Sequence, residues 1–272
     1  MTELLIVGGG KMGEALLAGL LAAGRKADGI VVVEPVAARR DELAERYGVA
    51  ARADVTDAEG VILAVKPDVV PAVAAEVAAA GTRRVLSIAA GVTIATMEAA
   101  GLTEPTAVVR SMPNTPALVG QGAAAMCGNA AAGDDDLDWA EEILSSVGIV
   151  VRTSEALLDA VTGLSGSGPA YVFLVAEALI DGGVRAGLPR PVAADLATQT
   201  LLGAATLLRA GTSPAELRAN VTSPGGTTAA GLHALETAGV RAAFADAVAA
   251  AAARSVELGA APSAAPSDTP AS

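Results

Sequence analysis

Residues 221–228, near the end of the chain, carry the clearest chemical signal in the sequence. They read Val-Thr-Ser-Pro-Gly-Gly-Thr-Thr and lead directly into a helical pattern over residues 229–238. A Ser-Pro-Gly-Gly turn that opens a helix exposes several backbone N–H groups, and these groups together with the helix dipole favour a bound anion. The hydroxyls of Thr227 and Thr228 stand at the same place. We therefore predict a site for a small anionic substrate at this turn.

A glycine-rich loop near the start of the chain predicts a dinucleotide site. Gly8, Gly10 and Gly13 fit the spacing G-x-G-x-x-G, with Lys11 and Met12 between the last two glycines. The loop follows a short apolar strand and opens a helix, which is the context that makes this spacing informative. The first glycine permits a tight turn, the second lets the backbone approach the pyrophosphate, and the third allows close packing of helix on strand.

Glu34 bears on the choice of dinucleotide. It ends the second expected strand, about 20 residues beyond the glycines, where an acidic side chain accepts a hydrogen bond from the adenosine ribose and repels a 2′-phosphate. This position favours NADH. Arg39 and Arg40 follow one helical turn later and could instead accommodate NADPH. Both NADPH and NADH therefore stay open as cofactors.

Two more loops follow expected strands and carry polar side chains. Ala64-Val65-Lys66-Pro67 lies where open α/β sheets bind ligands, so Lys66 could reach the cofactor or the substrate. Pro67 suits the first turn of the next helix. Asn114 lies in a later loop that two prolines stiffen, and its amide could hold the nicotinamide carboxamide or serve the loop itself.

Small residues gather in residues 162–171, which read Thr-Gly-Leu-Ser-Gly-Ser-Gly-Pro-Ala-Tyr. They would let two helices, or a ligand, approach the backbone closely. Packing is the reading that we favour.

The distribution of lysine argues against a rival centre for the chemistry. The chain has three lysines, Lys11, Lys26 and Lys66, all within its first 70 residues. The β-hydroxyacid dehydrogenases also join a dinucleotide domain to a helical one, but they place a catalytic lysine on a helix of the second domain. Since no lysine follows Lys66 here, the threonine-bearing turn is the better candidate.

Hydrophobic periodicity supplies the elements that must position these residues. Short apolar runs at residues 4–7, 30–33, 61–65, 85–88 and 106–109 alternate with helical patterns, which predicts a doubly wound parallel sheet of the Rossmann type. Residues 123–126 and 149–151 could extend the sheet at its edge. Only helical patterns follow residue 158. We expect a dinucleotide-binding domain at 1–158, an all-α domain at 159–259 and a disordered Ala/Pro/Ser-rich tail at 260–272.

Composition narrows the class of protein further. A formal charge of −12 argues against nucleic acid and anionic membrane surfaces as partners. A single cysteine excludes an internal disulfide, and with one histidine besides it the usual zinc ligand sets are missing, so we expect no metal. The start of the sequence lacks a basic signal-peptide pattern and we find no apolar run of about 20 residues free of charge or glycine breaks. The expectation is a cytoplasmic protein.

These motifs, taken in order, resemble the pyrroline-5-carboxylate reductase family. The likeness runs from Leu5 to about Leu258 and covers the glycine loop, the Ala-Val-Lys-Pro strand end, and residues 87–91, 112–116, 159–171, 181–188 and 221–228. The last stretch is the most specific of them. A departure is Glu34, because many members carry small or basic residues there, and it bears on the cofactor preference alone.

The resemblance implies reduction of Δ1-pyrroline-5-carboxylate to L-proline with NADPH or NADH, and an all-α C-terminal domain that forms a homodimer, in some cases a pentamer of dimers. It places Thr228 next to the ring nitrogen, as a proton relay or an orienting group. The implied substrate-binding residues are Val221, Ser223, Gly225, Gly226, Thr227 and Thr228. A reductase of the six-membered homologue and a non-catalytic regulatory protein of the same fold remain as alternatives.

Overall fold

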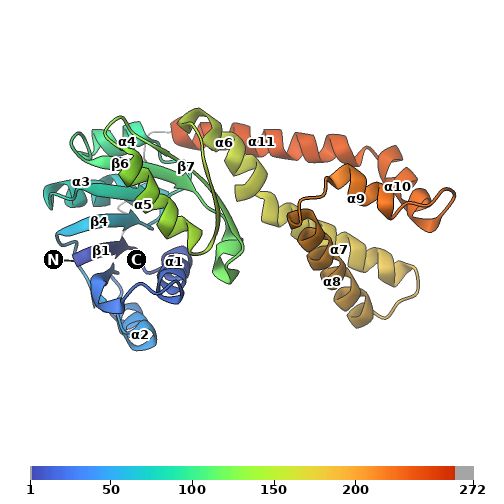
Figure 1. Cartoon of the computed structure of the whole chain (residues 1–272), viewed down its shortest axis with the longest axis horizontal. Coiled ribbons are helices and arrows are strands. Elements are labelled where there is room, and N and C mark those ends of the chain that lie inside the picture. Colours follow the sequence, from blue (N-terminus) through green and yellow to red (C-terminus); the bar gives the residue numbers. More distant parts are fainter. Residues whose placement is uncertain (1, 261–272) are drawn as a thin grey trace, which may run out of the picture. The chain divides into compact units, whose positions relative to one another are not determined.

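The computed structural model describes residues 2–260 and contains the expected doubly wound sheet (Figure 1). Within these residues the sheet has eight strands in the order β3-β2-β1-β4-β5-β6-β7-β8. Their bounds are β1 Thr2–Val7, β2 Ile30–Val33, β3 Ala50–Arg52, β4 Ala58–Leu63, β5 Arg84–Ser87, β6 Ala107–Met112, β7 Gly122–Gly128 and β8 Gly148–Arg152.

The strand order reverses between β1 and β4, and this is the point at which such sheets bind ligands. β1 lies between β2 and β4 and pairs in parallel with both. Its Leu5 is opposite Val31 on β2 and Val61 on β4. β7 departs from the parallel arrangement, because it runs antiparallel to β6 with Ser111 opposite Met126. The predicted Rossmann-type sheet is confirmed, except that β7 and β8, which pair in parallel with each other, run opposite to β1–β6.

Both faces of the sheet are covered by helices, so its central strands are apolar throughout. Leu4 and Ile6 of β1 pack with α1 (Lys11–Ala22), α2 (Ala37–Tyr47) and α5 (Asp134–Ser145). Leu5 and Val7 point to the other face, against α3 (Val70–Ala79), α4 (Ile94–Ala99) and α6 (Leu158–Val161). The alternation follows from the two-residue period of a strand.

The second part of the chain is helical, as expected from its sequence. It contains α7 (Gly168–Arg185), α8 (Arg190–Arg209), α9 (Pro214–Asn220), α10 (Thr227–Thr237) and α11 (Val240–Ala260). Contacts divide the chain into a sheet unit, which takes the described residues up to Ser167 and from Ala250 onward, and a helical unit, Gly168–Ala249. The division thus falls nine residues later than the sequence-based boundary at 158, and α11 ends in the sheet unit.

The helical unit buries little of its own apolar surface. Among its described hydrophobic residues only Ala193 and Ala197 are buried. Its large exposed side chains are Val172, Phe173, Leu174, Leu179, Leu188, Val192, Leu196, Leu202, Leu207, Leu208, Val221, Leu235 and Phe244. Apolar surface of this extent is typical of a subunit interface.

One helical stretch among the described residues, Glu155–Arg185, is long and apolar enough to cross a membrane by length and composition, with a mean hydropathy of 1.3. Only 6% of the 18-residue apolar segment within this stretch is buried. The stretch combines α6, a short π-helix at Thr162–Gly166 and α7, and it contains glycines and acidic residues.

Sequence patterns did not reveal two short elements. β3 has only three residues, Ala-Ala-Arg. It forms by pairing with β2, where Ala51 is opposite Val32. α4 is six residues long, and Thr93 caps it by accepting the Thr96 N–H. Elements this short lack the periodicity that sequence analysis needs. Residues 261–272, most of the expected disordered tail, lie outside the described residues, and Ala260 ends α11.

Candidate active site

The N-terminus of α1 presents unpaired backbone N–H groups at the switch point of the sheet. Gly10 is the N-cap residue, and the first intrahelical bond runs from the Glu14 N–H to the Gly10 carbonyl at 2.9 Å. The N–H groups of Lys11, Met12 and Gly13 therefore precede the hydrogen-bond ladder and point out of the helix end. A Cβ added at Gly10 would have no atom within 4 Å, so open space lies in front of these groups.

The other two glycines hold the loop against the end of β4. Gly8 has φ of 111°, and a Cβ there would lie 2.5 Å from the Ala64 carbonyl oxygen. A Cβ at Gly13 would lie 2.1 Å from the Gly8 carbonyl oxygen. Neither position can carry a larger side chain without displacing backbone. The predicted cofactor residues Gly8, Gly13 and Ala64 are thus brought together, and the cradle fits a dinucleotide pyrophosphate.

Glu34 lies beside this loop, as the sequence predicts. Its carboxylate accepts the Gly9 N–H at 3.1 Å through one oxygen and the Val36 N–H at 3.0 Å through the other. A carboxylate oxygen has a second lone pair, so both oxygens keep capacity for a ribose hydroxyl. The two backbone bonds hold the negative charge of Glu34 at the rim of the loop.

The two arginines that follow Glu34 are bound to the protein itself. Arg39 donates from Nε to the Gly9 carbonyl at 2.9 Å and forms an ion pair with Glu14 of α1 at 2.5 Å. Arg40 donates from Nη1 to the carbonyls of Glu34 and Pro35, both at 2.8 Å. Arg39 thus stabilises the glycine loop, and Arg40 stabilises the turn between β2 and α2.

Glu14 joins α1 to α2 through this arginine. Burial disfavours its charged form, but hydrogen bonds from Arg39 and from Tyr47, the latter at 2.8 Å, outweigh that effect and hold the pKa of Glu14 below its ordinary value. Sequence reasoning does not identify Glu14, because its role depends on α2 lying beside α1. A glutamate one turn into the helix also has an ordinary explanation in the helix dipole.

The residues that follow β4 line the same edge of the sheet. The Ala64 N–H donates to the Val7 carbonyl at 2.8 Å, which continues the pairing with β1 one residue beyond the end of β4. Lys66 is exposed, Val65 is half-buried, and Pro67 begins a 3-10 helix, η2 (Pro67–Val69). The prediction that Pro67 starts a helical turn is confirmed.

Asn114 is buried, and both the oxygen and the nitrogen of its side-chain amide form hydrogen bonds to the backbone. Its Oδ1 accepts the Ala123 N–H and its Nδ2 donates to the Ser165 carbonyl, both at 2.9 Å. One N–H of the amide remains for another acceptor. The contact with Ser165 links two segments that the sequence analysis treats separately.

The helix α10, in the helical unit, also begins at a glycine without a side-chain cap. Gly226 is its N-cap residue, and the ladder begins with the Ala230 N–H donating to the Gly226 carbonyl at 3.2 Å. The N–H groups of Thr227, Thr228 and Ala229 therefore lie ahead of the ladder. Gly225 has φ of 69°, and nothing lies within 4 Å of a Cβ added there.

Ser223 and Thr228 place hydroxyls at this turn. The Gly226 N–H donates to the Ser223 carbonyl at 3.1 Å, and a Cβ at Gly226 would lie 2.4 Å from the Ser223 Oγ. Ser223 is exposed and Thr228 is half-buried, while Val221 at the end of α9 is 65% exposed. The predicted substrate residues thus form one local turn with the donors and hydroxyls that a carboxylate requires.

The fold and these two helix starts define a class: a Rossmann-type, dinucleotide-dependent oxidoreductase with an added helical unit. Residues 3–91 match the family model described as NADP oxidoreductase, coenzyme F420-dependent. Residues 155–258 match the model described as pyrroline-5-carboxylate reductase dimerisation.

Curated relatives and solved structures match this chain over nearly its whole length. A pyrroline-5-carboxylate reductase of a Synechocystis species is 49% identical, with 94% of this chain and 98% of that protein covered. Its counterpart in Arabidopsis thaliana is 41% identical, with 93% and 94% covered. The solved structure of a pyrroline-5-carboxylate reductase from Coxiella burnetii has a TM-score of 0.91 at 36% identity, with 96% and 99% covered.

A second solved structure adds a bound cofactor. It is the Plasmodium falciparum pyrroline carboxylate reductase with NADP bound, which has a TM-score of 0.81 at 30% identity and covers 95% of this chain and 98% of its own. The chain belongs to the pyrroline-5-carboxylate reductase family.

Alanine substitutions at Gly10 and Gly13 distinguish an effect on cofactor binding from an effect on folding. We expect Gly13→Ala to lower the thermal stability strongly, because its Cβ meets a backbone oxygen at 2.1 Å. We expect Gly10→Ala to unfold like the wild type but to bind NADPH about 10-fold more weakly, because its Cβ enters the open space before the helix end. Thermal unfolding and calorimetric titration with NADPH measure the two effects. Wild-type affinity in Gly10→Ala would argue against this pyrophosphate site.

Proposed function

We propose that the chain reduces Δ1-pyrroline-5-carboxylate to L-proline with NAD(P)H, the last step of proline biosynthesis. The observation that carries the proposal is the full-length likeness to reductases of that name, at 49% identity for the Synechocystis protein. The two open helix starts support it, because the reaction needs one site for a dinucleotide and one for a small carboxylate. The relatives carry the name of the five-membered substrate, so neither alternative from the sequence analysis is retained.

The residues of the sheet unit fit the cofactor. The N–H groups at Lys11, Met12 and Gly13 would hold the pyrophosphate, Glu34 the adenosine ribose, and the strand end at Ala64–Pro67 the part of the cofactor nearer the reaction. When bound there, NAD(P)H supplies the hydride that is added to the imine carbon.

The turn before α10 would hold the substrate through its carboxylate. Ser223 and the backbone donors from Gly225 to Thr228 offer neutral hydrogen bonds, and the positive end of the helix dipole adds to them. Val221 offers an apolar wall beside the five-membered ring. Fixing the carboxylate in this way orients the imine, and orientation of this kind contributes several kcal/mol to catalysis in general.

Thr228 would act on the ring nitrogen. Reduction adds a hydride to the imine carbon and a proton to the nitrogen, and a protonated imine is already a good electrophile. A threonine hydroxyl is a weak acid, so its role is to hold the nitrogen in place or to pass on a proton from water.

The exposed helical unit supports a homo-oligomer, and its family match supports a dimer formed through residues 155–258. We propose a dimer as the basic unit and a pentamer of dimers as the larger assembly. The apolar stretch Glu155–Arg185 then serves as interface, so we propose no membrane contact. A net charge of −12 supports the further proposal of no nucleic-acid partner. We also propose a cytoplasmic location.

Thr228→Ala tests the role of the hydroxyl. We expect kcat/KM for pyrroline-5-carboxylate to fall about 10-fold or more, equivalent to about 1.4 kcal/mol, because the imine nitrogen loses its hydrogen-bond partner. Steady-state oxidation of NAD(P)H measures it. Thr237→Ala, at the other end of the same helix, is the control and should behave like the wild type. Wild-type kinetics in Thr228→Ala would contradict the assignment.

Glu34 sets the cofactor preference in this proposal. We expect the wild type to use NADH at least as well as NADPH, because the fixed carboxylate repels a 2′-phosphate. Glu34→Gln removes the charge and keeps one of the two acceptors for the Gly9 and Val36 N–H groups, so the ratio of kcat/KM for NADPH to that for NADH should rise about 10-fold. Parallel assays with the two cofactors check both statements. A wild-type enzyme with strong preference for NADPH would refute the role of Glu34.

Leu174→Arg tests the interface. Leu174 on α7 is 65% exposed, and a buried arginine without a partner would disfavour association. We expect light scattering after size exclusion to show a dimer or decamer for the wild type and a mass near the 26.5 kDa of one chain for the variant. Leu118→Arg is the control, since Leu118 is 51% exposed but lies in the sheet unit. An unchanged mass for Leu174→Arg would place the interface elsewhere.

A further inference from the structure

The first segment of the sheet unit ends one residue after a π-helix at Thr162–Gly166. The Ser167 N–H donates to the Thr162 carbonyl at 2.8 Å, five residues back, which is the bond that defines this wider turn. π-turns interrupt the regular pairing of helix carbonyls, and they are frequent at functional sites. The chain enters the helical unit at the next residue, Gly168.

The amide of Asn114 attaches this π-turn to the loop that follows β6. Its Nδ2 reaches the Ser165 carbonyl at 2.9 Å, while its Oδ1 is held by the Ala123 N–H at the start of β7. Asn114 is 9% exposed, so these bonds are shielded from water. Loss of the amide would leave the Ser165 carbonyl without this buried donor.

Direct packing brings the π-turn onto the end of β6 as well. A Cβ at Gly166 would lie 2.5 Å from the Met112 Cε, so the backbone of the turn rests on that side chain. Asn114 and Met112 are two residues apart and make their contacts with consecutive residues of the turn.

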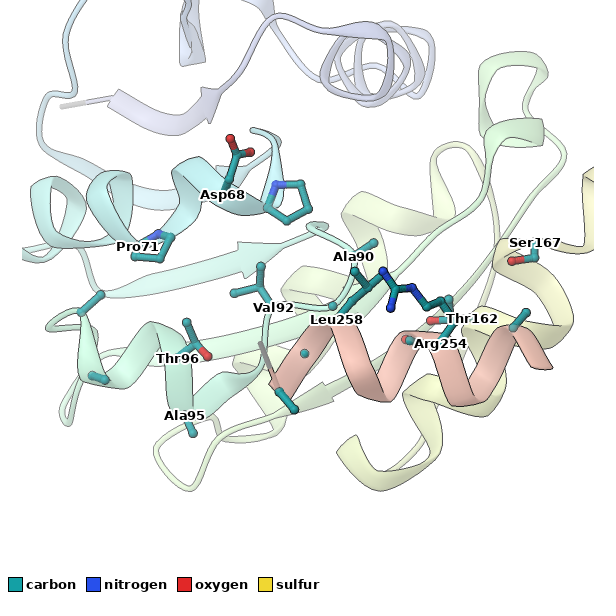
Figure 2. Close-up of a pocket in the computed structure, with 18 residues that line it drawn as sticks. Asp68, Pro71, Ala90, Val92, Ala95, Thr96, Thr162, Ser167, Arg254 and Leu258 are labelled. Atoms are coloured by element: carbon teal, nitrogen blue, oxygen red, sulfur yellow. The ribbon is translucent and has the colours of Figure 1, made fainter. Parts of the chain in front are cut away.

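The π-turn is also a wall of a cavity at the ends of β4 and β5. The cavity has a volume of about 1080 Å³, and its lining includes Pro67 after β4, Ala90 and Gly91 after β5, and Thr162 and Ser167 of the turn. Figure 2 shows Thr162 beside Arg254 and Ser167 beyond them, on the side of the cavity away from Asp68 and Pro71. The turn therefore shapes the edge of the sheet at which the cofactor is proposed to bind.

We infer that Asn114 is a positioning residue for the reduction, which rests on the proposed function. It acts through Ser165: it holds the π-turn against the strand ends, and the turn sets both the shape of the crevice and the point at which the chain continues to the substrate-binding unit. Hydride transfer is sensitive to small displacements, since a shift of about 1 Å can cost about 100-fold in rate. The predicted contact with nicotinamide is not needed for this role.

Two substitutions at Asn114 separate positioning from cofactor contact. Asn114→Asp is nearly isosteric and keeps the acceptor for the Ala123 N–H, but it puts an acidic oxygen opposite the Ser165 carbonyl. Asn114→Ala removes both bonds. We expect kcat to fall at least about 10-fold in each variant, while the calorimetric Kd for NADPH stays within about two-fold of the wild type. Hydrogen exchange of residues 162–168 should become faster in both.

Asn129 offers a matched control. Its Oδ1 accepts the Val108 and Ala132 N–H groups, both at 3.0 Å, and its Nδ2 donates to the Glu98 side chain and the Thr106 carbonyl, both at 3.2 Å. It bonds to residues at the opposite end of β6 and is not among the residues that line the cavity. We expect Asn129→Ala to lower the melting temperature as much as Asn114→Ala does, with kcat unchanged.

Each other outcome overturns the inference. A weaker Kd for NADPH with unchanged exchange at 162–168 would make Asn114 a cofactor ligand. An equal loss of kcat in the Asn129 variant would make the effect one of general stability. Should Asn114→Ala fail to fold, Asn114→Asp decides, and wild-type kcat in that variant refutes the role. An inactive wild type would refute the proposed function instead, while the exchange data would still report on the contact with Ser165.

Discussion

The first N–H groups of a helix have no partner within it, and this constraint underlies both binding sites proposed for the chain. α1 and α10 begin after Gly10 and Gly226, residues that have no side chain to cover those groups. Two other helices carry a side-chain cap, since Thr93 caps α4 and Ser213 caps α9, whereas α2, α3 and α8 have none. An open helix start is therefore not by itself a site, and at α1 and α10 the proposal rests on the glycine loop and the Ser-Pro-Gly-Gly turn that precede them.

The glycine loop is held in shape before any ligand arrives. Glu34 accepts the Gly9 N–H, Arg39 donates to the Gly9 carbonyl, and Glu14 fixes Arg39. A loop whose backbone is already ordered loses less conformational entropy on binding, so more of the interaction energy appears as affinity. If the cofactor binds as proposed, the same contacts place the negative charge of Glu34 where the two dinucleotides differ.

Polar anchors also hold the segment that leads from the sheet to the helical unit. Arg110 is buried on β6 and forms an ion pair with Glu155 at 2.8 Å, and the same carboxylate oxygen accepts the Ile94 N–H. Ser255 of α11 donates to Asp159 of α6 at 2.6 Å. Buried polar groups are costly unless they are paired, so such contacts favour one arrangement of the segment over others. The contact from Asn114 to Ser165 completes this set.

The local sequence predicted the sheet and most helices, because these depend on hydrophobic periodicity. It also predicted the glycine loop and the turn before α10, because both have glycine at a helix start. It could not reveal the bonds of Glu14, Asn114 and Arg110. Those residues act on partners 25 to 51 positions away. Which side chains meet across such distances depends on strand order and helix packing, and only the tertiary structure decides it. The open helix starts were visible in the sequence, whereas the contacts that hold their surroundings in place were not.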